Sequence, residues 1–270
     1  MNDAADRPFV LIPCLNEERA IEGLLHGVLA HCRDVIVIDD GSTDRTADIV
    51  ARMPVTLIRH PRRRGKGEAL RTGFREALER GAGGVLTMDG DGQHDPADIP
   101  RILAAARVFP DAMIIGARLL EREHQPESRR RANDFADWGI SWGCGRPVAD
   151  TQSGQRWYPR AAVQLVELPA QDFVFEAAVL IAASRDLEMP IVSVPIASRY
   201  ASDARRSHFR PVRDVLRITW YTCRRIAHYG HVLQSYRASH GSPPLIHDPG
   251  HLLDAAPPTP LADAGRWPGP

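Results

Sequence analysis

Short apolar runs alternate with longer amphipathic stretches between residues 9 and 116. The runs are rich in β-branched side chains, which is typical of buried strands; they cover residues 9–13, 35–38, 55–58, 85–88 and 112–116. Helical spacing of apolar residues between the runs predicts helices over residues 17–32, after Thr43 as N-cap, through Leu70, Phe74 and Leu78, and over residues 97–109. The alternation predicts an α/β domain with a mostly parallel sheet and helices on both faces.

The pattern is less regular after Arg118. Residues 119–128 and 201–209 are polar and predict loops, and residues 150–158 predict an extended segment with a turn at residues 153–154. We expect helices over residues 129–142 and 175–183, a strand over residues 191–195, and a long helix that begins at Pro211 and ends at Tyr236. Proline, glycine and small residues dominate from His240 onward, so we expect a disordered tail there.

Composition limits the classes of protein to consider. The chain has 270 residues, of which 43% are hydrophobic, enough to bury the core of one large domain. Its 34 basic and 34 acidic residues give no net charge, so bulk charge does not point to nucleic acid as a partner. The four cysteines are far apart, the first eight residues lack the apolar core of a signal peptide, and no apolar run is long enough to span a membrane. We expect a cytoplasmic protein.

Polar and charged residues follow four of the predicted strands. Parallel strands place their carboxyl ends at one edge of a sheet, where ligands bind, so we expect these residues to meet there. Two carboxylates one residue apart, Asp89 and Asp91, lie on a glycine-rich turn and suit a hard cation such as Mg²⁺ or Mn²⁺. The D-x-D pattern alone is common in exposed turns. The residues after the four strands are Asn16-Glu17, Asp39-Asp40, Gly65-Lys66-Gly67 and Asp89-Gly90-Asp91.

The order and spacing of these motifs resemble family 2 glycosyltransferases, most closely the dolichyl- or polyprenyl-phosphate mannose and glucose synthases. The resemblance extends over about residues 9–213. It implies a GT-A fold with a Rossmann-like sheet, and an inverting transfer from a UDP- or GDP-linked sugar to an acceptor that is a lipid or polyprenyl phosphate. The motifs that carry it are Ile12-Pro13-Cys14-Leu15-Asn16-Glu17, Asp39-Asp40-Gly41-Ser42, Gly65-Lys66-Gly67, Asp89-Gly90-Asp91-Gly92-Gln93-His94, Asp150-Thr151-Gln152-Ser153-Gly154, Phe175-Glu176 and Ser207-His208-Phe209.

The resemblance also implies roles on the donor side. Pro13, Asn16 and Glu17 would line the nucleoside pocket, and Asp39 would accept hydrogen bonds from the base. For Asn16 and Glu17, a helix cap and a favourable first-turn acid are the structural alternative. The remaining donor-side residues share the task of holding phosphate or metal: Lys66, Arg118 and Arg205 for the diphosphate, and Asp89, Asp91 and Gln93 for the cation, with Asp89 also near the nucleotide.

The acceptor side is less determined by the motifs. Asp150 is the candidate general base for a hydroxyl acceptor, with Asp172 and Glu176 as rivals; Gln93 assists metal or sugar. A phosphate acceptor is already ionised and needs no base, and Asp150 would then bind or orient it. Gln155 stands where the family often has phenylalanine, and His208 replaces a residue that is often basic.

We expect residues 1–210 to form the GT-A domain, residues 211–238 an amphipathic helix and residues 239–270 the tail. Val215, Thr219, Cys223, Ile226, Tyr229, Leu233 and Tyr236 share one predicted face of that helix, and basic residues share another. The helix either packs on the domain or lies in a membrane interface as a peripheral contact. Trp138 and Trp142 are expected in the core or an interface.

Two other classes use similar residues. A metal-dependent nucleotidyltransferase also has a parallel sheet and carboxylates, but it usually places a Gly-rich basic loop directly after the first strand, where this chain has residues 13–17. A non-catalytic nucleotide-sugar-binding relative is disfavoured because the set of Asp39, Asp89, Asp91 and Gln93 is intact. A dinucleotide-dependent dehydrogenase is disfavoured because no G-x-G-x-x-G follows the first strand.

Overall fold

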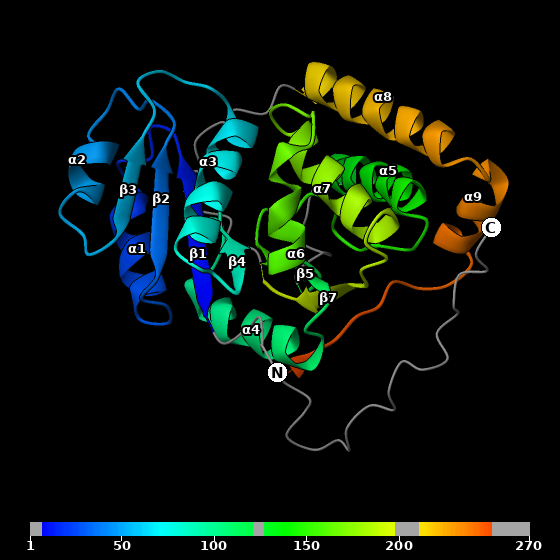
Figure 1. Ribbon diagram of the computed structural model, residues 1–270, viewed down its shortest axis with the longest axis horizontal. Coiled ribbons are helices and arrows are strands. Elements are labelled where there is room, and N and C mark those ends of the chain that lie inside the picture. Colours follow the sequence, from blue (N-terminus) through cyan, green and yellow to red (C-terminus); the bar gives the residue numbers. More distant parts are fainter. Residues whose placement is uncertain (1–6, 121–126, 198–210, 250–270) are drawn as a thin grey trace.

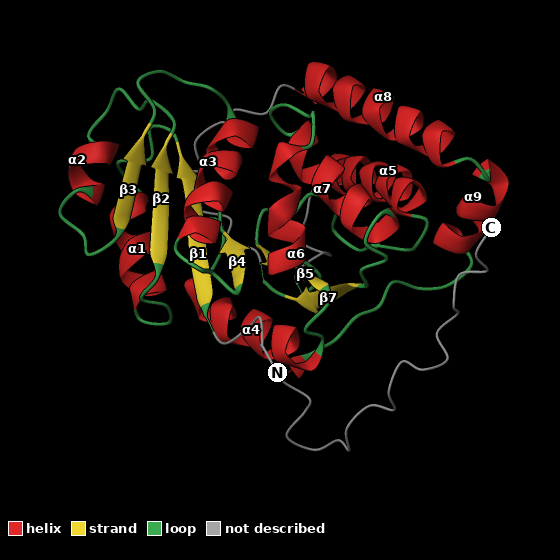
Figure 2. Cartoon of the chain, viewed as in Figure 1, coloured by secondary structure: helices red, strands yellow, loops and turns green. Residues whose placement is uncertain are grey.

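A single seven-stranded sheet forms the centre of the molecule (Figures 1 and 2). The computed structural model describes residues 7–120, 127–197 and 211–249. The strand order is β3-β2-β1-β4-β6-β5-β7, and β6 runs antiparallel to both of its neighbours while the other pairs are parallel. The strands are β1 (Pro8–Cys14), β2 (Val35–Asp39), β3 (Thr56–Arg59), β4 (Gly84–Thr87), β5 (Met113–Ala117), β6 (Arg156–Pro159) and β7 (Ile191–Pro195). The predicted mostly parallel α/β sheet is confirmed.

Helices cover both faces of the sheet, which explains why the strands are apolar along their whole length. One face packs against α1 (Ile21–Leu29), α2 (Thr46–Val50) and α4 (Ile99–Val108). The other packs against α3 (Lys66–Glu79), α5 (Glu127–Cys144), α6 (Arg160–Val163) and α7 (Val174–Arg185). Successive residues of a strand enter opposite layers: Val10 and Ile12 lie in the first core, Phe9 and Leu11 in the second.

The C-terminal region differs from the single long helix that the sequence predicted. It forms α8 (Pro211–Tyr229) and α9 (Val232–His240), because Gly230 (φ 67°) and His231 (φ 48°) adopt left-handed backbone conformations that end the helix. Both helices pack on α5, and α8 also packs on α7. Of the residues predicted to share one face, Ile226 is buried but Val215, Thr219, Cys223, Leu233 and Tyr236 are exposed, so the helices do not pack on the domain through most of that face.

The chain remains ordered beyond α9. Ser193 of β7 donates its backbone N–H to Leu245 and accepts one from His247, at 2.8 and 2.9 Å. Arg101 of α4 pairs with Asp248 at 2.9 Å. The expected disordered tail is therefore wrong for residues 239–249, because these contacts with β7 and α4 hold a segment whose composition alone favours disorder. Residues 250–270 lie outside the described part.

No helix within the described residues is both long and apolar enough to cross a bilayer.

Candidate active site

The loops after β1 and β2 are joined through Asn16. Its side-chain Oδ1 accepts the backbone N–H of Thr43 at 2.7 Å, and its own N–H donates to Ser42 Oγ at 2.8 Å. Asn16 adopts φ 58°, and the Glu17 N–H donates to Thr46 Oγ1 at 2.7 Å. Neither side chain caps α1, which begins at Ile21, so the helix-cap alternative is wrong for Asn16. Thr43 likewise does not cap α2, whose N-cap is Arg45.

Asp39 lies at the end of β2 and is completely buried. Its Oδ1 accepts the Ser42 N–H at 2.9 Å, which fixes the turn after the strand. Its Oδ2 lies 3.0 Å from Arg59 Nε but has no hydrogen-bond partner, and the half-exposed Arg59 side chain covers it. Because Oδ2 has an ion-pair contact but no hydrogen bond, it could accept an N–H from a ligand that enters after Arg59 moves aside.

Asp40 holds the loop that leads to Lys66. Its carboxylate accepts the backbone N–H groups of Arg64 and Gly65, both at 2.8 Å, and lies 2.8 Å from Nδ1 of the buried His60. Asp40 therefore does more than turn the chain after β2, because it sets the start of α3. The sequence pattern did not single out Arg59 or His60, although Arg59 ends β3 and His60 directly follows it at the ligand-binding edge.

Lys66 joins two carboxylates from separate elements. Its Nζ lies 2.6 Å from Asp89 Oδ1 and 3.1 Å from Glu176 Oε2. Burial alone would lower the pKa of Lys66, but the charges of Asp89 and Glu176 raise it above its usual range. Burial would conversely raise the pKa of Asp89, but Lys66 and His94 hold it well below its usual range. Within this cluster, Lys66 and Asp89 are thus both charged at neutral pH.

Glycines allow the loops to approach this cluster. A Cβ at residue 154 would overlap the Asp89 carboxylate, so the turn before β6 reaches Asp89 only as glycine. Gly65 has φ 98°, a conformation that other residues rarely adopt, and a Cβ there would overlap the Asp172 carboxylate. Pro13 is buried in β1, and its carbonyl oxygen lies beside Gly90. The acidic turn is therefore packed closely against β1 and the turn that precedes β6.

Asp91 and Gln93 form the exposed side of the acidic turn. Gln93 donates its backbone N–H to Asp91 Oδ1 at 3.0 Å and its side-chain amide to Oδ2 at 2.8 Å. The described residues contain no preformed cluster of three His, Cys, Asp or Glu ligands. The donor set nevertheless fits a hard cation, because two carboxylates share one turn and a positive charge already sits against Asp89. A bound diphosphate would supply the remaining oxygen ligands.

Strand order sets the distance between Asp39 and Asp89. β2 and β4 both pair with β1, so Asp39 and Asp89 are two strand spacings apart, about 10 Å. The structure thus brings Asp39, Lys66 and Asp89 to one edge of the sheet, as the sequence predicted.

Asp150 and Arg118 form an ion pair beside the cluster. Asp150 Oδ2 accepts the Arg118 backbone N–H at 2.8 Å and Nε–H at 2.7 Å, and Oδ1 lies 2.6 Å from Nη2. Burial raises the pKa of Asp150, but the hydrogen bonds and charge of Arg118 lower it overall. A carboxylate held in this way is a weak proton acceptor, so the arrangement favours binding or orientation over general-base catalysis.

The half-buried Asp137 and the buried Arg156 support the Asp150 turn. Asp137 of α5 accepts the Asp150 N–H at 3.0 Å and the Thr151 N–H at 2.7 Å, and burial raises its pKa to about 6 against the effect of the Thr151 hydrogen bonds. Arg156, fully buried in β6, donates to the carbonyl oxygens of Ser153 at 2.7 Å and Thr151 at 2.6 Å. Sequence reasoning missed both, because their roles depend on contacts between α5, β6 and the turn.

The remaining candidates are divided between the cluster and its surroundings. Glu176 joins Lys66, whereas Asp172 (φ 50°) pairs with Arg217 of α8 at 3.0 Å. His94 is buried, with Nε2 3.7 Å from Asp89. Arg205 lies outside the described residues. Trp142 donates its indole N–H to the Val232 carbonyl at 3.1 Å, which confirms its expected place in an interface, here with α9.

The chain is similar in sequence to proteins of a known family. The model of the family "Glycosyl transferase family 2" matches residues 9–161. An undecaprenyl-phosphate mannosyltransferase from Micrococcus luteus is 30% identical over 70% of this chain and 82% of its own length. A UDP-N-acetylglucosamine--dolichyl-phosphate N-acetylglucosaminyltransferase from Methanococcus voltae is 28% identical over 71% of this chain and 85% of its own.

The fold is also found among solved structures. Glucosyl-3-phosphoglycerate synthase from Mycobacterium tuberculosis, crystallised with Mn²⁺, UDP and phosphoglyceric acid, superposes with a TM-score of 0.59. It is 22% identical and covers 84% of this chain and 80% of its own. At this identity the likeness bears on the fold alone.

Proposed function

The chain belongs to glycosyl transferase family 2 and is a glycosyltransferase with a GT-A fold, and from that premise we propose that it transfers a sugar from a nucleotide-diphosphate sugar to a polyprenyl phosphate with inversion. The observation that carries the proposal is the cluster of Lys66, Asp89 and Glu176 at the carboxyl edge of the sheet. Family membership decides against the nucleotidyltransferase alternative.

The donor would lie along the edge from Asp39 to Asp89. Asp39 Oδ2 would accept an N–H of the base once Arg59 has moved, and the loop held by Asn16 would border the ribose. Asp89 and Asp91, with Gln93 orienting Asp91, would hold Mg²⁺ or Mn²⁺. When bound, the cation would neutralise the diphosphate as the bond to the sugar breaks. Lys66 would turn from Asp89 toward the same phosphates.

The acceptor class follows from the relatives and from the state of Asp150. The relatives from Micrococcus luteus and Methanococcus voltae are named for undecaprenyl phosphate and dolichyl phosphate. A phosphate oxygen would attack the anomeric carbon as the bond to the nucleoside diphosphate breaks, and no proton has to be removed. An ionised Asp150, paired with Arg118, suits such a reaction because it cannot act as a strong base. The Asp150–Arg118 pair would instead orient the acceptor phosphate, so Arg118 would not hold the donor diphosphate as the sequence suggested.

The outer surface of the C-terminal helices supports contact with a membrane. Leu216, Trp220 and Leu233 have exposed fractions of 63, 64 and 73%, although they are large apolar residues. Basic Arg224 and His228 are exposed on the same helix as Trp220. Apolar and basic groups on one helix favour an interfacial position on anionic lipid. Flotation with anionic vesicles tests this contact: Leu233→Asp should reduce the bound fraction, and undiminished binding would contradict it.

The activity is tested with purified protein, undecaprenyl phosphate in detergent, and a panel of UDP- and GDP-linked sugars with Mg²⁺ or Mn²⁺. We expect one donor to yield a lipid-linked sugar, and removal of the cation with EDTA to abolish the product. Asp91→Asn should lower turnover at least a hundredfold without unfolding, because Asp91 is exposed. The exposed Asp48 of α2 offers a matched control, and Asp48→Asn should retain turnover. Lipid product formed by Asp91→Asn at the normal rate would refute the assignment.

A further inference from the structure

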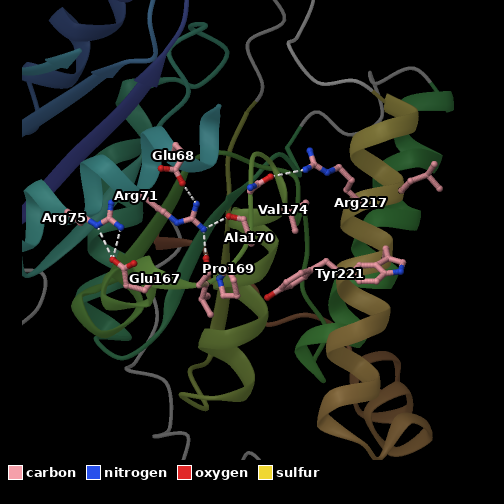
Figure 3. A pocket seen from close by; sticks show the side chains of 13 residues that line it. Glu68, Arg71, Arg75, Glu167, Pro169, Ala170, Val174, Arg217 and Tyr221 are labelled. Carbon is pink, nitrogen blue, oxygen red and sulfur yellow. Dashed lines mark hydrogen bonds and ion pairs between the residues drawn. The ribbon is translucent and has the colours of Figure 1, made fainter. Parts of the chain in front are cut away.

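An open cavity of about 710 Å³ lies between α3, the segment before α7, and α8 (Figure 3). Cavities of this size are large enough for a small-molecule ligand. Its position is set by helix packing, because α8 crosses α7 and leaves a gap toward α3. The lining residues are Glu68, Arg71, Arg75, Glu167, Leu168, Pro169, Ala170, Gln171, Val174, Leu216, Arg217, Trp220 and Tyr221.

The charges around this cavity are already paired. Arg71 donates to the carbonyl oxygens of Leu168 and Ala170 and lies 2.6 Å from Glu68. Arg75 lies 2.8 Å from Glu167, and these pairs are drawn in Figure 3. Because each guanidinium has an acidic partner, the cavity is a poor site for an additional phosphate. Its polar wall is neutralised from within the protein, which favours a neutral occupant.

The opposite wall is apolar and open to solvent. Leu216 and Trp220 line the cavity from α8 even though each is more than half exposed, at 63 and 64%. Leu168 and Pro169 line the cavity from the segment before α7. Large apolar groups that remain exposed around a cavity mark a surface for an apolar ligand. Burying these side chains against hydrocarbon would be favourable, because it removes apolar surface from water.

The cavity begins next to the catalytic cluster. Glu68 lines it from α3 two residues after Lys66, and Val174 lines it from α7 two residues before Glu176. Residues two apart on a helix lie on different sides of it. The first turns of α3 and α7 therefore each contribute to the cluster on one side and to the cavity on another. The Asp172–Arg217 pair, 3.0 Å apart, joins the two regions, because Asp172 packs against Gly65 and Gly67 on either side of Lys66 and Arg217 lines the cavity.

Resting on the proposed transfer to a polyprenyl phosphate, we infer that this cavity binds the isoprenoid chain of the acceptor nearest its phosphate. The phosphate would stay at the Asp150–Arg118 pair, whose turn packs against Asp89 through Gly154, and the chain would pass the Asp172–Arg217 pair into the cavity. The same helix presents Trp220 to the membrane and to the cavity, so a chain that leaves the bilayer along α8 enters the cavity directly.

Chain-length preference in detergent solution tests this inference. The experiment compares kcat/KM for undecaprenyl phosphate with kcat/KM for the short geranyl phosphate. For Trp220→Gln we expect the ratio of the two values to fall about tenfold, because the variant removes a large part of the apolar wall. Leu233→Gln serves as the control, because Leu233 is more exposed than Trp220 but does not line the cavity. Its ratio should equal that of the wild type.

An unchanged ratio in Trp220→Gln, or an equal fall in both variants, would overturn the inference, since general contact with detergent would then explain the preference. A photoreactive isoprenyl phosphate gives a second measurement that does not need turnover. We expect it to label peptides that contain residues 168–174 and 216–221, and labelling confined to α5 or α9 would also overturn the inference. If the wild type glycosylates neither phosphate, the proposed function itself fails, which is a different outcome from transfer without chain-length preference.

Discussion

Replacement of Lys66 by methionine should make the protein bind Mn²⁺ more tightly when no nucleotide is present. The Lys66 ammonium lies against Asp89 at 2.6 Å, where it occupies a position that a cation would take. Removing the charge leaves Asp89 and Glu176 without their common partner. The two carboxylates then attract a divalent cation without having to release an ammonium group first.

The magnitude follows from the contact. A hydrogen bond between charged groups contributes about 1.5–3 kcal/mol. The Asp89 side chain is 30% exposed, so solvent screening favours the lower end of this range. If loss of the Lys66–Asp89 contact opposes Mn²⁺ binding by about 1.5 kcal/mol, Lys66→Met should bind Mn²⁺ about tenfold more tightly. The same variant should bind a nucleoside diphosphate with Mn²⁺ more weakly than the wild type, because Lys66 no longer reaches the phosphates.

Isothermal titration calorimetry with Mn²⁺ alone, and then with Mn²⁺ and UDP or GDP, measures both effects. Arg63→Met is the matched control: it removes one positive charge from the same loop, and Arg63 is exposed. We expect its Mn²⁺ affinity to change less than twofold, since screened charges interact weakly. Unchanged or weaker Mn²⁺ binding by Lys66→Met would refute the view that the amine and the metal compete for Asp89.

Three further substitutions test the turn before β6. Gly154→Ala should lower turnover more than tenfold, because the added Cβ overlaps the Asp89 carboxylate; normal kcat would contradict that packing. Arg118→Ala should raise KM for the lipid phosphate and leave donor affinity unchanged, so an equal loss for both substrates would show that Asp150 and Arg118 do not act on the acceptor. The pKa of Asp137 rises from 3.8 to about 6 on folding, so the folded state binds the extra proton and the free energy of unfolding falls as pH rises through this window. Between pH 4 and pH 7, the free energy of unfolding measured with urea should fall by about 2 kcal/mol more in the wild type than in Asp137→Asn. An equal fall in both proteins would contradict the raised pKa of Asp137.

The local sequence pattern was sufficient to predict most of the sheet and the residues at its carboxyl edge. Apolar runs located six of the seven strands, because strands buried on both faces require apolar side chains at every position. The parallel arrangement then brought Asp39, Lys66 and Asp89 together without further information. Pattern was insufficient for β6, which was predicted only as an extended segment: whether it pairs, and in which direction, depends on its neighbours β4 and β5.

The sequence by itself therefore determined the fold class and which acidic and basic residues follow the strands, since both depend on short-range periodicity and chain order. Only the tertiary structure decided the partners of those residues. That Lys66 neutralises Glu176, that Arg118 holds Asp150, and that Arg59 covers Asp39 all depend on side chains from different elements. The break at Gly230 and the path of residues 241–249 along β7 were decided there too. Each of these side chains could form other contacts of similar free energy, and its partner is determined only when the helices and strands pack against one another.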